Sequence, residues 1–202
     1  MSISSRRSVP QIDGYVLAGG QSSRFGADKA LIDIDGVPLV RKLRDLVTGF
    51  CGNCTVVAST GGRYADLGLM TIPDRVAGRG PMSGLHTALH HAHADFVLLV
   101  SCDLVGLRAE WLITLRDAIR TGDRAVAFRH EYWEPMPAVY HASIRDEVDR
   151  RLVAGPLSMQ RLLDDLSARA VSRPSDWHDA VQVNTPDDLR RYLASRPEGE
   201  RK

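Results

Sequence analysis

This 202-residue chain has almost no net charge, few cysteines and no long apolar run. Each of these absences excludes or disfavours a class of function. The formal net charge of +1 creates no basic surface field, so the composition gives no support to nucleic-acid binding. No apolar run reaches the roughly 18 residues of a membrane span, and the first 11 residues lack the apolar core of a signal peptide. Three cysteines fit a reducing compartment. We therefore expect a cytoplasmic protein that binds neither nucleic acid nor membranes.

The composition is that of one soluble domain. Hydrophobic residues make up 44% of the chain and charged residues 25%, which is ordinary for a globular protein. A chain of this length can bury a sizeable core, and no repeat, linker or low-complexity segment interrupts it. We predict a flexible arm over residues 1–11, one domain over 12–195 and a flexible tail over 196–202.

Apolar segments with strand and helix periodicity alternate along the chain. That alternation favours an α/β fold of three layers, a Rossmann-like arrangement in which helices cover both faces of a mostly parallel sheet. The predicted strands are 15–17, 55–58, 69–72, 96–100, 125–128, 137–140, 170–171 and 181–183. The predicted helices are 38–50, 83–93, 108–120, 144–152, 159–166 and one that begins after Thr185.

The first strand is followed by a glycine-rich, basic segment that predicts a phosphate site. Gly19 and Gly20 let the backbone approach a ligand closely, and Arg24 and Lys29 offer a planar fork and a point charge for phosphate oxygens. No Gly-Lys-Ser/Thr follows, so this is not a Walker motif, and the Gly-x-Gly-x-x-Gly fingerprint is absent. The alternative is an ordinary glycine turn with two solvated cations, but such a turn needs neither both glycines nor the basic pair.

Three further polar residues follow predicted strands, where ligands bind in parallel sheets. They are Asp74, Asp103 and Asn184. Asp103 ends the most apolar strand, and a carboxylate there suits Mg²⁺, which takes one or two carboxylates together with waters and phosphate oxygens. Each residue alone could be a loop or helix cap, so their shared placement is what favours a site.

His86, His90 and His93 are spaced four and three residues apart and share one face of a predicted helix. Metal binding is conceivable, but neither a His-Glu-x-x-His motif nor a nearby cysteine supports it. We favour a solvated or partly buried helix face.

Cys51 and Cys54 form a single Cys-x-x-Cys pair. A tetrahedral zinc site needs four ligands, or three and a water, and no second pair accompanies them. We therefore interpret the pair as a loop coincidence, and Cys102 as a small core residue.

Together these motifs resemble the GT-A-like nucleotidyltransferases, whose signature is Leu-Ala-Gly-Gly-x-x-x-Arg-x-Gly-x-Asp-Lys. Asp28 to Leu31 is most similar to the ending found in molybdenum cofactor guanylyltransferases, and Gly80 to Gly84 is similar to their Gly-Pro-Leu-Ala-Gly stretch near the base and ribose. The segment from Asn184 to Leu189 resembles their Asn-Thr-Pro-Glu-Asp-Leu. The chain departs from the family with Leu104 in place of a Thr-Pro or x-Pro continuation, and with Ser59 beside the position of a nucleotide-contacting Asn.

The resemblance implies an enzyme that transfers GMP from GTP to the phosphate of molybdenum-molybdopterin and releases pyrophosphate, with Mg²⁺ as cofactor. The partners it implies are GTP, molybdopterin and molybdoenzymes or cofactor-insertion proteins. The implied catalytic residues are Arg24, Lys29 and Asp103, and the implied metal ligands are Asp103 and Asn184. The implied nucleotide-binding residues are Leu17, Ala18, Gly19, Gly20, Lys29, Asp74, Gly80, Pro81, Gly84 and Asp103.

Other functions stay open from the sequence. A molybdopterin cytidylyltransferase or a sugar-1-phosphate nucleotidyltransferase would use the same chemistry, and a nucleotide-binding partner without catalysis would need only part of the site. A non-catalytic partner is disfavoured because Arg24, Lys29 and Asp103 are all present. Trp133 and Trp177, in polar sequence surroundings, predict either an acceptor pocket or an interface.

Overall fold

A seven-stranded sheet forms the centre of the computed structural model, which describes residues 9–19 and 28–196. Its strand order is β10-β8-β9-β6-β1-β4-β5. The strands of this sheet are β1 (Ile12–Leu17), β4 (Thr55–Ala58), β5 (Thr71–Pro73), β6 (Phe96–Ser101), β8 (Ala125–Arg129), β9 (Trp133–His141) and β10 (Arg169–Ser172). The predicted site residues Gly20 and Arg24 lie outside the described residues.

The sheet is mostly parallel. β1 pairs in parallel with β4 and β6, and β4 with β5 and β8 with β10 do the same. β9 alone among these strands runs antiparallel, between β6 and β8. Two short antiparallel pairs lie outside the sheet: β2 (Asp33–Ile34) with β3 (Val37–Pro38), and β7 (Leu104–Val105) with β11 (Val181–Gln182).

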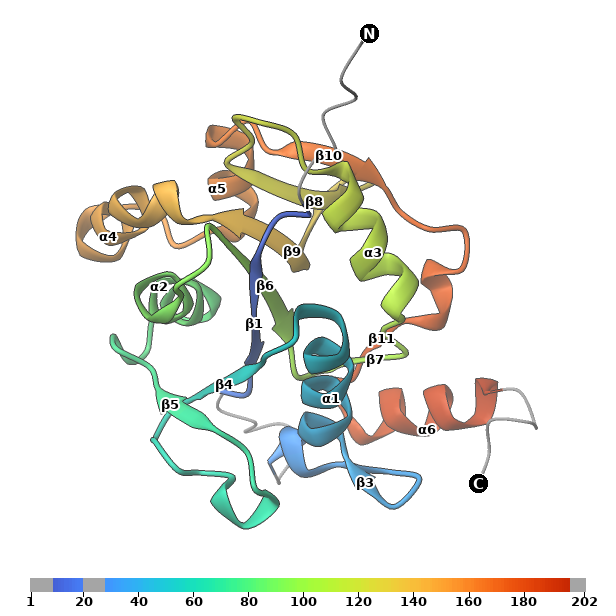
Figure 1. Cartoon of the computed structure of the whole chain (residues 1–202). Coiled ribbons are helices and arrows are strands. Elements are labelled where there is room, and N and C mark those ends of the chain that lie inside the picture. The colour runs from blue at the N-terminus through green and yellow to red at the C-terminus, as the bar shows by residue number, and fades with distance from the viewer. Residues whose placement is uncertain (1–8, 20–27, 197–202) are drawn as a thin grey trace, which may run out of the picture.

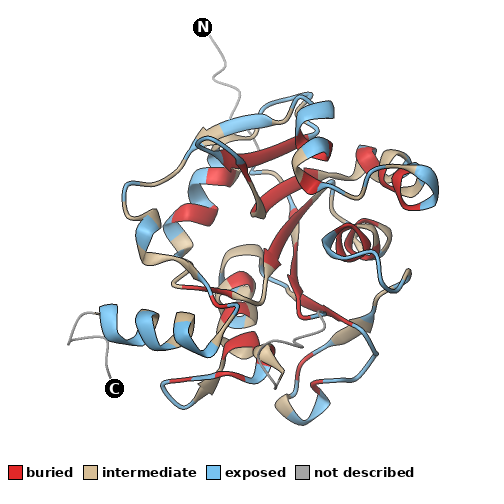
Figure 2. Ribbon diagram, turned by 180° about the vertical axis from the view of Figure 1, so that it is seen from behind, coloured by how far each residue is buried: buried red, intermediate tan, exposed pale blue. Residues whose placement is uncertain are grey.

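Helices cover both faces of the sheet, as Figure 1 shows. One face packs on α1 (Leu39–Cys51) and α3 (Ala109–Ala118), and the other on α2 (Pro81–His91), α4 (Arg145–Ala154) and α5 (Met159–Asp165). Side chains alternate along β1, so that Val16 faces the first layer while Tyr15 and Leu17 face the second. The inner strands β1, β4 and β6 are therefore buried on both sides, as Figure 2 shows in red, whereas the edge strands β5 and β10 are partly exposed.

The last helix, α6 (Pro186–Ser195), lies apart from these layers and exposes much of its surface (Figure 2). Its start is fixed by a capping box, in which the Thr185 hydroxyl accepts from the Asp188 N–H and the Asp188 carboxylate accepts from the Thr185 N–H. Pro186 occupies the first turn, where its missing N–H costs nothing. The cap fixes the backbone directly after Asn184.

The predicted α/β class is confirmed, and most predicted elements lie where the periodicity placed them. The helix predicted from residue 83 begins at Pro81, because a proline is well suited to the first helical position. The strand predicted over 69–72 is β5, at Thr71–Pro73, and β9 begins earlier than predicted, at Trp133. The domain boundaries stay predictions. No helix in the described ranges is long and apolar enough to cross a membrane.

Candidate functional site

A cleft of about 280 Å³ opens at the carboxyl edge of the sheet, beyond the ends of β1, β4, β5 and β6. Both ligand-bearing segments predicted from the sequence, the glycine-rich loop and the strand-end acids, contribute to its walls. The residues that line it are Leu17, Ala18, Gly19, Asp28, Lys29, Val57, Asp74, Gly80, Pro81, Gly84, Ser101, Cys102, Asp103 and Met136.

Lys29 reaches this edge from a short 3₁₀-helix, Lys29–Leu31. Asp28 caps that helix by accepting a 3.1 Å hydrogen bond from the Ala30 N–H. The Lys29 Nζ donates to the Asn184 Oδ1 at 2.9 Å, although these two residues are 155 positions apart. The loop after the first strand and the segment before α6 therefore meet at the cleft.

Tyr64 and Arg63 fix the position of Asp28. The Arg63 guanidinium pairs with the Asp28 Oδ2 at 2.9 Å. The Tyr64 hydroxyl lies 3.0 Å from the same carboxylate oxygen and 3.2 Å from the carbonyl oxygen of Ala18, and its ring is buried. Because Ala18 directly follows the first strand and Asp28 precedes Lys29, one side chain contacts the chain on both sides of residues 20–27. Burial raises the pKa of Tyr64, so its hydroxyl keeps its proton to donate.

Asp103 follows the buried strand β6. Its carboxylate accepts a 2.6 Å hydrogen bond from the Ser101 hydroxyl, and its carbonyl oxygen accepts from the Val183 N–H at 2.8 Å. Because Val183 directly precedes Asn184, the second hydrogen bond brings the Asn184 segment close to Asp103. Within the described ranges the Asp103 carboxylate has no ion-pair partner, so it can accept a cation.

Asp74 follows β5, and its N–H donates to the carbonyl oxygen of Ala58 at 2.8 Å. A Cβ atom at Gly19 would lie 3.5 Å from the Asp74 Oδ2, so the glycine loop and this carboxylate are close neighbours. Burial raises the pKa of Asp74, an effect that the hydroxyl groups of Ser83 and Thr87 oppose. The ionised carboxylate is therefore held at some cost to folding.

The amino end of α2 forms the remaining wall of the cleft. Gly80 adopts a φ angle of +62°, a backbone conformation that is strained for a residue with a side chain. Pro81 begins the helix. Gly84 lies against Leu17: a Cβ atom there would come within 2.5 Å of a Leu17 methyl group. Glycine at position 84 thus permits α2 to pack closely on β1 beside the cleft.

The chain matches a known protein family over most of its length. The MobA-like NTP transferase domain matches residues 14–193. The chain belongs to the MobA-like NTP transferase family. The predicted family and the predicted enzyme class, nucleotidyltransferase, are confirmed.

Three relatives illustrate the match. A protein of Nostoc sp. (strain PCC 7120 / SAG 25.82 / UTEX 2576) named "Probable molybdenum cofactor guanylyltransferase" is 32% identical over 185 residues, which cover 88% of each chain. The "Molybdenum cofactor guanylyltransferase" of Yersinia pestis (strain Pestoides F) is 30% identical over 182 residues, covering 89% of this chain and 93% of that one. The crystal structure of molybdopterin-guanine dinucleotide biosynthesis protein A from Archaeoglobus fulgidus is 25% identical, with a TM-score of 0.75, covering 89% of this chain and 96% of its own.

Three carboxylates line the cleft of this family member, and their surroundings differ. Asp28 is neutralised by Arg63. Asp74 and Asp103 form no ion pair in the described part of the chain, and Lys29 is the one described cation in the lining. A polyphosphate would therefore meet excess negative charge unless a cation bound with it. Carboxylate and amide oxygens such as those of Asp103 and Asn184 are hard donors, which fit Mg²⁺.

Some residues singled out in the sequence lie elsewhere or have other contacts. The Ser59 hydroxyl accepts a 2.7 Å hydrogen bond from Arg63, so in this structure it supports the Asp28 pair. Cys51 and Cys54 are free, and burial raises the pKa of both thiols to about 12. Both are therefore protonated thiols at neutral pH, which gives no support to redox or metal chemistry there.

Trp133, predicted to line an acceptor pocket or an interface, is buried in the core, and its indole N–H donates to Asp164 at 2.7 Å. Trp177 stacks on Trp111, and neither predicted tryptophan lines the cleft. Sequence reasoning also missed Tyr64, since an isolated tyrosine in a loop shows no motif. The polar contacts to Asp28 could be found only once the loop of residues 59–64 was placed in space.

Proposed function

We propose that this enzyme transfers GMP from GTP to the phosphate group of molybdenum-molybdopterin and releases pyrophosphate. The observation that supports this most is the convergence of Lys29, Asp103 and Asn184 at one edge of the sheet. An amine and a free carboxylate, close to a glycine-lined strand end, suit a metal-bound polyphosphate better than a neutral ligand. The names of the relatives supply the base and the acceptor.

The transfer joins two anions, so the protein has to hold them in line and offset their charge. An oxygen of the acceptor phosphate forms a bond to the α-phosphorus of GTP. The bond from that phosphorus to the oxygen that bridges to the β-phosphate breaks, and its electron pair leaves with pyrophosphate. No nucleophilic side chain is needed, because the acceptor phosphate is itself the nucleophile.

Different residues of the cleft are assigned to the phosphates and to Mg²⁺. We assign Lys29 and the backbone of Gly19, with Gly20 and Arg24, to the β- and γ-phosphates, where negative charge grows as pyrophosphate leaves. The hydrogen bond from Lys29 to Asn184 holds the amine at the cleft before the nucleotide binds. Asp103 and Asn184 would hold Mg²⁺, which when bound neutralises phosphate charge and polarises the α-phosphate.

We assign base recognition to the segment from Gly80 to Gly84 at the amino end of α2. Backbone groups there can contact a purine edge, and the close packing of Gly84 on Leu17 sets the width of the cleft. Asp74, whose carboxylate accepts a hydrogen bond from Thr87 of the same helix, is assigned to the nucleotide. A cytoplasmic location and transfer of the product to molybdoenzymes or cofactor-insertion proteins stay predictions.

The experiment that tests this function offers ATP, CTP, GTP and UTP separately, each with Mg²⁺ and purified molybdopterin. Of the four nucleotides, we expect only GTP to release pyrophosphate, and we expect a pterin-guanine dinucleotide to form with it. Asp103→Asn, which keeps the size and removes the charge, should abolish turnover while GTP binding without Mg²⁺ changes little. Preferential use of CTP, or pyrophosphate release that does not need the pterin, would contradict the proposal.

A further inference from the structure

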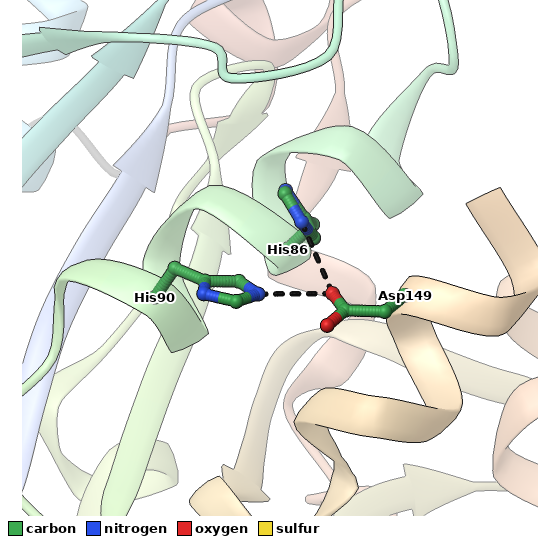
Figure 3. A group of neighbouring side chains, drawn as sticks. All are labelled: His86, His90 and Asp149. Atoms are coloured by element: carbon green, nitrogen blue, oxygen red, sulfur yellow. Dashed lines mark hydrogen bonds and ion pairs between the residues drawn. The ribbon is translucent and has the colours of Figure 1, made fainter. Parts of the chain in front are cut away.

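A second cluster of ligating side chains lies outside the cleft, between α2 and α4. Figure 3 shows the imidazoles of His86 and His90 pointing from α2 toward the carboxylate of Asp149 on α4. The Nε2 atoms of His86 and His90 lie 3.1 Å and 2.9 Å from the same oxygen, Asp149 Oδ1. The two rings are 4.5 Å apart between centroids.

The histidines share a helix face because they are four residues apart. Asp149 comes from a helix 59 positions beyond His90, so no sequence spacing could have predicted it as the third member. Within the described residues, these three are the one group of histidine, cysteine and acidic side chains that brings three ligand atoms within 4.8 Å of one another. His93, predicted on the same face, is not part of the group.

We propose that His86, His90 and Asp149 form a site for a divalent transition metal of the Zn²⁺ class, separate from the Mg²⁺ site at Asp103. Two imidazole nitrogens and one carboxylate are a common protein ligand set for zinc, with a water completing the tetrahedron. Bonds of about 2.0–2.1 Å in a tetrahedron set its ligand atoms about 3.3 Å apart. The two distances to Asp149 are close to that length, and all three ligand atoms lie within 4.8 Å of one another, so local side-chain movements would bring them onto one metal ion.

The Nε2 atom of His86 is the ring nitrogen that faces Asp149. Its Nδ1 atom is buried and has no hydrogen-bond partner in the described structure. When Nε2 binds a metal, the single proton of a neutral His86 lies on Nδ1.

The Asp149 side chain is 41% exposed, so a metal ion and its water can reach the cluster from solvent. A metal bound there would join α4 to α2 with three strong bonds in place of two hydrogen bonds. The amino end of the same α2 forms one wall of the cleft. Because the metal would bind the folded state alone, it should raise the free energy of unfolding. It should also restrict movement of α2, whose amino end carries Gly80 and Gly84.

The test is an equilibrium titration of chelator-treated protein with Zn²⁺ alone, in competition with a chromophoric chelator. We expect one tight equivalent in the wild type, and affinity lower by about a hundredfold in His90→Ala and in Asp149→Asn, because each variant loses one of three protein ligands. His178→Ala removes a histidine that is 78% exposed and outside the cluster, and should bind Zn²⁺ like the wild type. Saturating Zn²⁺ should also raise the Tm of the wild type and of His178→Ala only.

Cobalt provides an independent reading, since Co²⁺ in a tetrahedral site absorbs visible light far more strongly than Co²⁺ in an octahedral one. An intense visible band that Asp149→Asn loses would support the site. Should His90→Ala fail to fold, the partly exposed Asp149→Asn decides, with circular dichroism to verify its fold. The absence of a stoichiometric Zn²⁺ equivalent, or equal Zn²⁺ affinity in folded Asp149→Asn and the wild type, would overturn the proposal and leave the carboxylate as a hydrogen-bond acceptor for both imidazoles.

Discussion

The Lys29 ammonium donates a 2.9 Å hydrogen bond to the Asn184 side chain from the opposite end of the sequence. Lys29 follows the glycine-rich loop of the first strand, and Asn184 directly precedes the capping box of α6. The Val183 N–H bonds the carbonyl oxygen of Asp103, so the same segment also contacts the residue assigned to the metal. The short stretch before α6 thus connects Lys29 and Asp103, the residues that we assign to phosphate and to the metal.

That connection predicts thermodynamic coupling between Lys29 and Asn184. Lys29→Ala should weaken GTP binding by about ten- to a hundredfold, because it removes a charge-assisted contact to phosphate. Asn184→Ala should cost less, about tenfold or below. The double variant should bind GTP about as weakly as Lys29→Ala alone, since residues in contact show non-additive effects. Isothermal titration calorimetry with GTP measures all three.

The exposed Gln182→Ala is the control, because it removes an amide two positions upstream without a contact to Lys29. Repeating the titrations without Mg²⁺ separates the two roles of Asn184. An effect of Asn184→Ala that persists without the metal acts through Lys29. Strictly additive losses, with or without Mg²⁺, would show that the hydrogen bond does not position the amine.

Tyr64→Phe tests whether the tyrosine hydroxyl holds Ala18 and Asp28, which flank residues 20–27, in place. Only the hydroxyl is lost, so the core packing of the ring remains. We expect a stability loss of about 1 kcal/mol, which corresponds to a fall in Tm of about 2–4 °C for a domain of this size. GTP affinity should fall as well, because both Ala18 and Asp28 lose a contact. Tyr132→Phe, at a tyrosine that is 70% exposed, should change neither quantity.

Asp74→Asn is predicted to make the protein more stable at neutral pH while weakening nucleotide binding. Burial raises the pKa of Asp74, so ionisation costs the folded state more than the unfolded chain. Below the unfolded carboxyl pKa of about 3.9, both states are protonated and the cost is absent. It grows as the pH rises through the unfolded and folded pKa values, and is constant above them.

Unfolding midpoints measured from acidic to neutral pH check this sign. The Tm advantage of Asp74→Asn over the wild type should be greatest at neutral pH and should shrink toward acid. Asp66→Asn, an exposed carboxylate outside the cleft, serves as the control and should show no such trend. A stability gap that widens as the pH falls would mean that Asp74 gains, rather than loses, from ionisation in the folded state.

Gly84→Ala tests the assignment of the amino end of α2 to the base. The new methyl group would meet the Leu17 side chain and turn it toward the cleft. A clash of this kind is worth about 1–3 kcal/mol, so GTP affinity should fall on the order of ten- to a hundredfold while inorganic pyrophosphate binds nearly as before. Gly49→Ala introduces the same methyl group where nothing lies within 4 Å, and should leave both ligands unaffected. Equal weakening of GTP and pyrophosphate would assign Gly84 to the phosphates or to the fold.

The fold could be predicted because its local signals agree. The apolar strands, the helical periodicity and the cap at Thr185 each depend on neighbours in sequence, and the structure has them at or near the predicted positions. The antiparallel insertion of β9 between β6 and β8 was not predicted, since strand order depends on pairings between distant segments. Periodicity alone gives no strand direction.

The candidate site residues were predicted one by one from the sequence, but the contacts between them were not. A carboxylate such as Asp103 at the end of a buried strand is visible in the sequence, because its position follows from the strand before it. The partners of Asp28 and the approach of Asp149 to His86 come from segments with no shared motif. Contacts between such distant segments depend on tertiary packing, which cannot be predicted from a single sequence.

The proposed transfer is tested most directly by following the α-phosphorus. GTP labelled at that atom is incubated with Mg²⁺, purified molybdopterin and the wild-type enzyme, and the products are separated. We expect all transferred label in a pterin-guanine dinucleotide, formed in equal amount to unlabelled pyrophosphate, and none with Asp103→Asn. Label that stays in GTP, or that appears in free GMP with no dinucleotide formed, would contradict transfer to the pterin phosphate.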